Sequence, residues 1–272
     1  MSSSLSRILN VLNLFNPERL AIDADVIAQE FGLSRTSSYR YLKELCEAGL
    51  LAKRGPNGYV LGPRLIELDW MMRRYDPILS NGRVYIEQLS QRTGLTVFLS
   101  AFYDEKIINT FILSPNNDMS YTFGRGRPLP LFRGAQAKVL TSHQGIKKIK
   151  ELYQDIIEHD PLNNYSLEDI LKQAKQIRKD GFCITNNELN VGQTGIAAPI
   201  FLDPESKDVH TSISVVGSYE QFELLRKETI VEILLDTAQK LTLALSNTIS
   251  ISNQAIEPDS KKIDAEEVEH LK

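Results

Sequence analysis

Residues 34–43 read SRTSSYRYLK, and this stretch decides the fold of the N-terminal part of the chain. Ser34 is a favourable N-cap, so the pattern predicts a helix from about Arg35 to Ala48, which Gly49 ends. Helical spacing divides its side chains between two faces. The buried face is expected to hold Tyr39, Leu42, Leu45 and Cys46, and the outward face Arg35, Thr36, Ser37, Arg40, Tyr41 and Lys43.

The segments on both sides of this helix are short and fit one compact domain. Upstream, apolar residues recur at helical spacing over 5–15, and a second helix is expected over about 25–31, before a turn at Gly32. Downstream, two apolar runs, 50–54 and 59–61, flank the turn signal Gly-Pro-Asn-Gly. Helix, helix, turn, helix and hairpin is the element order of a winged helix-turn-helix.

Charge gives this domain a candidate partner. Residues 34–64 hold six Lys or Arg against two Glu, a net +4, whereas the whole chain carries −4. Helix-turn-helix proteins insert one helix into the DNA major groove, where hydroxyl and arginine side chains contact bases and phosphates. The candidate DNA contacts are Ser34, Arg35, Thr36, Ser37, Ser38, Arg40, Tyr41, Lys43, Lys53 and Arg54. The alternative is an amphipathic helix with a solvated polar face, against which the basic hairpin argues.

The remaining sequence predicts an α+β protein with a second domain. A linker helix is expected from about Arg64 to Tyr75, and Pro77 breaks it. Strands are expected over 96–103, 106–113, 121–123, 182–185, 196–201 and 209–216, and helices over 78–93, 134–142, 146–159, 167–179 and 223–250. The predicted division is a DNA-binding domain 1–63, a linker helix 64–76, a second domain 77–251 and an acidic, disordered tail 252–272.

Length and composition exclude several classes of protein. The 272 residues suit two domains, and 42% hydrophobic with 24% charged residues is ordinary globular composition. No apolar run approaches the roughly 20 residues of a membrane span, and no signal peptide is expected. Two cysteines, Cys46 and Cys183, cannot form a disulfide framework, so a cytoplasmic location is expected.

Taken together, the order and spacing of these segments resemble the IclR family of bacterial transcriptional regulators. The resemblance covers roughly residues 5–250. It is carried by residues 5–12, 34–42, 48–51 and 58–64 in the first domain, and by residues 130–140, Gly181-Phe182, Glu188-x-x-x-Gly192, 196–200 and 212–217 in the second. The resemblance implies a GAF-like domain with a six-stranded antiparallel sheet, flanking helices and a small-molecule pocket.

The resemblance also implies where an effector would bind. The matching positions are Ala135, Gln136, Thr185, Gly195, Ser214 and Val216. Three of them depart from the family, which often has a carboxylate at Thr185, a cysteine at Gly195 and a small hydroxyl residue at Val216. The effector is therefore expected to differ from that of the best-known members.

Three arginines beside glycines suggest the chemistry of the effector. Arg125, Arg127 and Arg133 fall within nine positions, and an arginine facing a pocket is a natural partner for a carboxylate. We therefore add Arg133 to the candidate effector contacts and expect an organic acid, with an aromatic acid as one candidate. The alternative is that these arginines form surface or interface ion pairs.

The sequence predicts a regulator rather than an enzyme. The four histidines show no metal-ligand spacing, no catalytic motif is present, and no cofactor is expected. The expected partners are double-stranded DNA, a small-molecule effector and further copies of the chain, with no membrane. The family resemblance implies a near-palindromic operator, a dimer or tetramer, and control of a catabolic operon. The alternative is a small-molecule sensor or an enzyme that uses its N-terminal module only for dimerisation.

Overall fold

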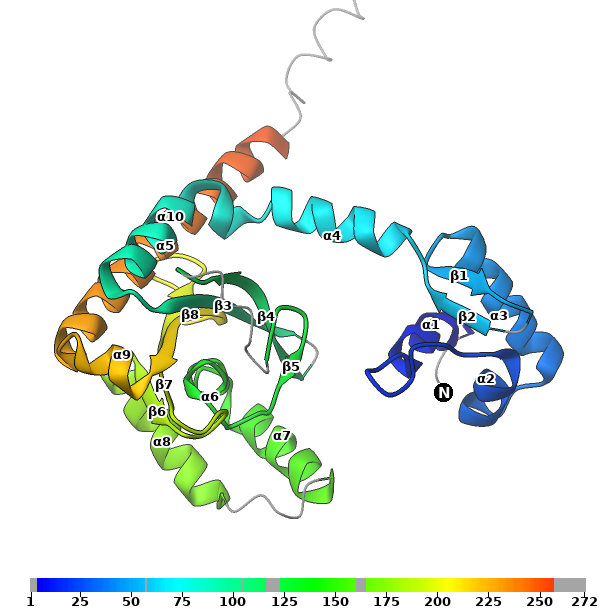
Figure 1. The fold of residues 1–272 in the computed structure, drawn as a ribbon, viewed down its shortest axis with the longest axis horizontal. Helices are drawn as coiled ribbons and strands as arrows, with labels where there is room; N and C mark the ends of the chain where they lie inside the picture. Colours follow the sequence, from blue (N-terminus) through cyan, green and yellow to red (C-terminus); the bar gives the residue numbers. More distant parts are fainter. Residues whose placement is uncertain (1–3, 57, 104, 116–122, 160–164, 257–272) are drawn as a thin grey trace, which may run out of the picture. The chain divides into compact units, whose positions relative to one another are not determined.

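The computed structural model describes residues 4–56, 58–103, 105–115, 123–159 and 165–256. The chain forms two compact units, Met1–Asp76 and Pro77–Lys272 (Figure 1). Within the described residues, none of the helices combines the length and the apolar character needed to span a bilayer.

The N-terminal unit is a helical domain with a small hairpin. Its elements are α1 (Ser4–Asn10), the 3-10 helix η1 (Val11–Leu14), α2 (Ala24–Phe31), α3 (Arg35–Glu47), β1 (Leu51–Arg54), β2 (Gly58–Leu61) and α4 (Arg64–Arg74). The Asp23 side chain accepts hydrogen bonds from the first backbone N–H groups of α2, and Ser34 does the same for α3. Between them Gly32 takes a left-handed conformation, φ 61°, which sets the tight turn.

A single core holds this unit together. Buried residues come from η1, α2, α3 and the hairpin, including Val11, Ile27, Leu42 and Leu51. The wing is tied to the segment before α2, because Ile22 and Tyr59 exchange backbone hydrogen bonds of 2.9 and 2.8 Å. This packing fixes α3 and the hairpin on one rigid framework.

The C-terminal unit contains an antiparallel sheet with the strand order β5-β4-β3-β8-β7-β6. Its strands are β3 (Thr96–Tyr103), β4 (Lys106–Leu113), β5 (Pro128–Leu129), β6 (Cys183–Asn186), β7 (Gln193–Phe201) and β8 (Val209–Ser218). Its helices are α5 (Pro77–Thr93), α6 (Ala135–Ser142), α7 (Ile146–His159), α8 (Leu167–Asp180), α9 (Tyr219–Glu223) and α10 (Lys227–Ile256).

Helices cover both faces of this curled sheet (Figure 1). On one face, Ile196 and Ile200 of β7 pack into the main core with α5 and α10. On the other, Ala197 packs against α6, behind which α8 lies. Alternate residues of β7 therefore pack into two different cores, one on each face of the sheet. The space between α6 and the sheet is where a ligand pocket can form.

The α+β class and the order of elements agree with the sequence prediction, with two local differences and one expected strand that falls mostly outside the described residues. One edge strand of the sheet is β5, and the strand expected over 121–123 falls on residues outside the described part, apart from Phe123, which lies in a turn. The final helix α10 begins at Lys227 rather than at Glu223, and the short helix α9 before it starts at a capping box between Ser218 and Gln221. Helix α10 also continues to Ile256, so residues 252–256 are helical, and the rest of the expected tail lies outside the described residues.

Candidate functional site

The outer face of α3 carries most of the residues predicted to contact DNA. Arg35, Thr36, Arg40 and Lys43 are exposed, with Ser34 at the N-cap and Ser37 half-buried in the first turn. Because all of them lie on the same side of the helix or at its start, they can meet one DNA groove together.

The predicted phase of α3 is wrong for its two tyrosines. Tyr41 is only 5% exposed and its hydroxyl lies 3.3 Å from that of Ser4, whereas Tyr39 is 44% exposed. Ser38 is also buried, and its hydroxyl donates to the Ser34 carbonyl oxygen at 3.2 Å. Ser38 and Tyr41 therefore belong to the core. Tyr39, which the sequence reasoning placed inside, joins the exposed face instead.

The cations of this surface differ in their ion pairs. Arg35 is paired with Asp25 at 2.8 Å, and Lys43 lies 3.6 Å from Glu47 on the next turn. Arg40 and the wing residues Lys53 and Arg54 are exposed and have no carboxylate partner within the described part of the chain. These three cations are available to phosphates without breaking an existing pair.

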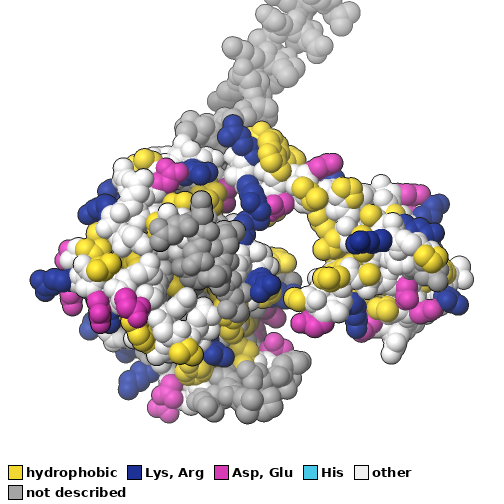
Figure 2. Space-filling model, viewed as in Figure 1, with side chains coloured by type: hydrophobic (Ala, Val, Ile, Leu, Met, Phe, Trp, Pro, Cys, Tyr) yellow, Lys and Arg dark blue, Asp and Glu magenta, His cyan; other side chains and the backbone are white. Residues whose placement is uncertain are grey.

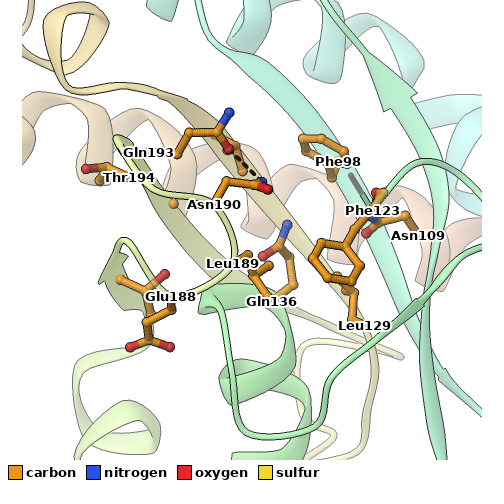
Figure 3. A pocket seen from close by; sticks show the side chains of 13 residues that line it. Phe98, Asn109, Phe123, Leu129, Gln136, Glu188, Leu189, Asn190, Gln193 and Thr194 are labelled. Carbon is orange, nitrogen blue, oxygen red and sulfur yellow. Dashed lines mark hydrogen bonds between the residues drawn. The ribbon is translucent and has the colours of Figure 1, made fainter. Parts of the chain in front are cut away.

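In the C-terminal unit, a pocket lies between the start of α6 and the curled sheet (Figure 3). Phe98 and Phe123 supply aromatic walls, and Gln136 reaches in from α6. The other lining residues are Asn109, Leu129, Thr185, Glu188, Leu189, Asn190, Gln193, Thr194, Gly195 and Val216. The cavity volume is about 30 Å³, which is room for roughly two water molecules.

Two polar side chains in this pocket have no hydrogen-bond partner among the described residues. The Gln136 side chain is 3% exposed and its amide makes no such bond, and the Thr185 hydroxyl is also free. By contrast, Asn109 is engaged, since its amide donates to the Phe123 carbonyl oxygen at 2.6 Å. Polar groups inside a protein are normally bonded, so the side chains of Gln136 and Thr185, which meet the cavity, can bond to a ligand there.

A carboxylate holds the loop beside the pocket. Glu188 Oε2 accepts from the Gly134 backbone N–H at 2.9 Å, and Glu188 Oε1 accepts from Lys138 Nζ at 2.6 Å. The Lys138 side chain is 10% exposed and that of Glu188 is 21% exposed. Figure 3 shows the Glu188 carboxylate pointing away from Gln136 and Phe123. The bond therefore anchors the loop that carries Leu189 and leaves the cavity to other groups.

The structure gathers most, but not all, of the predicted effector residues. Gln136, Thr185, Gly195 and Val216 line the pocket. Ala135 is fully buried and does not line the pocket, although a Cβ at Gly195 would lie 3.8 Å from its own Cβ. Ser214 is fully buried on the same face of β8 as Val216, and its hydroxyl has no partner.

The expectation for the arginines is not met. Arg133 is exposed, is absent from the pocket lining and donates to the Glu188 carbonyl oxygen at 2.7 Å. Arg125 donates to the Thr110 carbonyl oxygen. Sequence reasoning missed the two phenylalanines and the role of Glu188. For Glu188 the sequence does carry a signal, because the residue belongs to the Glu188-x-x-x-Gly192 motif through which the chain resembles the family.

No group of three potential metal ligands is found in the part of the chain that the structure describes. Burial raises the pKa of the Cys183 thiol to about 11, so it is protonated at neutral pH. This thiol is neither a nucleophile nor a metal ligand under ordinary conditions.

Comparison with known proteins supports the same interpretation. The family model "Bacterial transcriptional regulator IclR C-terminal" matches residues 74–243, and the "IclR helix-turn-helix domain" matches residues 4–55. The HTH-type transcriptional regulator XynR of Escherichia coli is 26% identical over 208 residues, which cover 73% of this chain and 80% of XynR. KdgR of Dickeya chrysanthemi is 24% identical over 202 residues, which cover 73% of this chain and 66% of KdgR.

Solved structures share the fold at low identity. A putative IclR transcriptional regulator from Silicibacter sp. TM1040 has a TM-score of 0.76 and 23% identity, covering 90% of this chain and 96% of that one. An IclR homolog from Microbacterium hydrocarbonoxydans, complexed with 4-hydroxybenzoate, has a TM-score of 0.68 and 21% identity, covering 90% and 100%. The matched families and relatives are transcriptional regulators and not enzymes. This chain, with its helix-turn-helix unit and its pocket-bearing α+β unit, belongs to the IclR family of bacterial transcriptional regulators.

Proposed function

We propose that this regulator binds a near-palindromic operator through α3 and the wing, and that a small organic acid in the pocket under α6 controls this binding. The favoured effector is a monocyclic aromatic acid, and the favoured target is a catabolic operon in the bacterial cytoplasm. The observation that carries the proposal is that the side chains of Gln136 and Thr185 line a cavity with aromatic walls and make no hydrogen bond with the described residues.

The pocket offers an acid a different partner from the expected arginine. The first backbone N–H groups of α6, including those of Ala135 and Gln136, have no carbonyl acceptor within the helix. A helix N-terminus favours a negative charge, so the effector carboxylate binds there while its ring lies between Phe98 and Phe123. The 4-hydroxybenzoate complex of the Microbacterium homolog supports an aromatic acid.

The size of the pocket supplies a mechanism of control. A benzene-sized ligand needs a cavity of about 150 Å³, several times the volume present in this structure. The ligand must therefore select a state in which Leu189 and its loop move outward. Because a ligand shifts an equilibrium only through different affinities for two states, this change in pocket size can be linked to DNA binding.

Helix α4 is the proposed dimer surface, together with α1. None of the α4 side chains is buried, although the helix carries Ile66, Trp70, Met72 and Tyr75, each more than half exposed. Leu5 and Leu9 of α1 are also exposed. Figure 2 shows hydrophobic side chains along α4 among charged ones. An apolar surface of this kind is typical of an interface, and pairing through it would present two copies of α3 to the two half-sites.

Calorimetric titration with 4-hydroxybenzoate tests the proposal. Replacing Gln136 with leucine should weaken binding by about tenfold or more, because it removes two hydrogen-bonding groups from an apolar site. Gln154→Leu, on the exposed face of α7, is the matched control and should bind as the wild type does. Equal affinities of the Gln136 variant and the wild type for every aromatic acid bound would refute the assignment of the pocket.

A further inference from the structure

A second cleft lies at the open edge of the sheet in the C-terminal unit. Strand β6 pairs with β7 only as far as Cys183 and Ala197, so Pro199–Phe201 has no neighbouring strand on that side. The end of α6, the turn after α8, and α10 close around this edge. They leave a cavity of about 270 Å³, nine times the volume of the pocket under α6.

The walls of this cleft are mainly apolar. They include Pro199, Phe201, Pro204, Leu235 and Leu243. One backbone group at the edge is already satisfied, because the Thr242 hydroxyl accepts from the Phe201 N–H at 3.2 Å and donates to the Ala238 carbonyl oxygen at 3.0 Å. The floor therefore suits the hydrocarbon part of a ligand and offers it few hydrogen bonds.

One side of the cleft is cationic. Arg178 donates one hydrogen bond, to the Ser142 carbonyl oxygen, and has no carboxylate partner within the described residues. No Asp or Glu lines the cavity. A guanidinium beside an apolar wall is well suited to a carboxylate, since its remaining N–H groups can form two parallel bonds to the two oxygens.

His143 adds an uncharged acceptor. Its Nδ1 lies 2.9 Å from the Val139 carbonyl oxygen, which places the proton on Nδ1. Burial lowers the pKa of His143, so the ring is neutral at pH 7 and its Nε2 keeps a free lone pair. The ring packs edge-to-face on Phe201, with the two centroids 5.8 Å apart.

We propose that this cleft is a second ligand site, separate from the effector pocket, and that it takes a small carboxylate with an apolar body. The carboxylate pairs with Arg178, and the body lies against Phe201 and Leu243. The volume is ample for a single ring, since about 150 Å³ holds benzene. This site exists as an open cavity in the present structure, whereas the pocket under α6 must widen.

Helix α6 connects the cleft to the effector pocket, and the inference that the two sites are coupled rests on the proposed function. Helix α6 has eight residues and is about 12 Å long. Gln136, in its first turn, lines the effector pocket, and His143, which follows its last residue, borders the cleft. A carboxylate that shifts α6 at one end therefore changes the fit of a ligand at the other.

Fluorine NMR titration of the full-length protein with 4-fluorobenzoate tests the second site. Arg178→Gln should weaken binding at the cleft by about tenfold or more, because a charge-assisted pair is lost. Lys179→Gln, a neighbouring exposed cation outside the lining, should have no effect. Leu243→Glu, at a half-exposed position, should also abolish binding by repulsion. The uncharged 4-fluorobenzamide should not bind.

The two sites can be separated by combining variants. With Gln136→Leu in place, the cleft should still bind 4-fluorobenzoate, and Arg178→Gln should then remove that binding. Loss of all binding in Gln136→Leu alone, or no response to Arg178→Gln, would overturn the second site and leave the effector pocket unaffected. If Leu243→Glu instead changes the sedimentation coefficient by separating subunits, the cleft is an interface between copies and the ligand proposal fails.

Discussion

Replacing Glu188 with glutamine should destabilise the C-terminal unit by about 2–3 kcal/mol. Breaking a buried ion pair costs about 3–5 kcal/mol when the remaining charge is isolated. Lys138 is almost fully buried, but Glu188 is one-fifth exposed, so water offsets part of this cost. The amide keeps the shape of the carboxylate. The loss therefore reports on charge and on the bond to the Gly134 N–H.

Differential scanning calorimetry measures this effect. For a unit of 150–250 residues, each kcal/mol lowers the Tm by about 2–4 °C, so a decrease of about 4–12 °C is expected. Glu151→Gln is the matched control, because its 3.8 Å pair with Lys147 is exposed and should be worth less than about 0.5 kcal/mol.

A double-mutant cycle excludes unrelated causes of the decrease. Lys138→Met removes the cation and keeps an apolar side chain, so the double variant should be less destabilised than the sum of the two single changes. We expect a coupling of about 1–3 kcal/mol. A Tm for Glu188→Gln within about 1 °C of the wild type, or strictly additive effects, would refute the account of this loop anchor.

Three further predictions concern burial, backbone conformation and helix phase. Burial raises the pKa of Cys183 from its ordinary value of 9.0 to about 11 in the folded protein. Between these two values the unfolded chain loses its thiol proton first, so the free energy of unfolding should fall by about 2–3 kcal/mol as the pH rises from the unfolded to the folded pKa. Cys183→Ala should abolish that part of the pH dependence in urea titrations. Gly134→Ala should lower the Tm, because φ at this position is +81° and a Cβ would lie 2.5 Å from a methyl group of Leu189. Gly195→Ala is the control, because a Cβ there would make only ordinary contacts. Equal Tm values for the two variants would contradict this prediction. Tyr41→Ala should destabilise the N-terminal unit by about 3 kcal/mol, because this side chain is buried. Tyr39→Ala, at an exposed position, should weaken DNA binding with little change in stability. The reverse pattern would support the helix phase predicted from the sequence, with Tyr39 buried and Tyr41 exposed.

Local patterns were sufficient to predict most elements. Strands β3 and β4 were predicted with the bounds observed, because alternation and the turn between them are properties of adjacent residues. The phase of α3 was harder. Both Tyr39 and Tyr41 fit a helical apolar stripe, and only tertiary packing shows that Tyr41 reaches Ser4 and that Ser38 is buried.

The pocket could be predicted only in part, for a physical reason. Gln136, Thr185, Gly195 and Val216 come together because the sheet order places β6, β7 and β8 beside α6. The bond from Glu188 to Lys138 joins residues 50 positions apart, and periodicity carries no information about such a pair. The same bond network explains Arg133, whose guanidinium binds the Glu188 carbonyl oxygen instead of a ligand.

The account depends most directly on whether α3 and the wing read a DNA sequence. Fluorescence anisotropy with DNA from upstream of the gene should show a preference over scrambled DNA of about 10³-fold or more. Arg40→Ala should remove most of this preference. Arg54→Ala should weaken binding to both DNAs and lower the salt dependence by about one phosphate contact. Arg19→Ala, outside α3 and the wing, is the control. Weak binding that is equal on both DNAs and unchanged by Arg40→Ala would contradict the central claim.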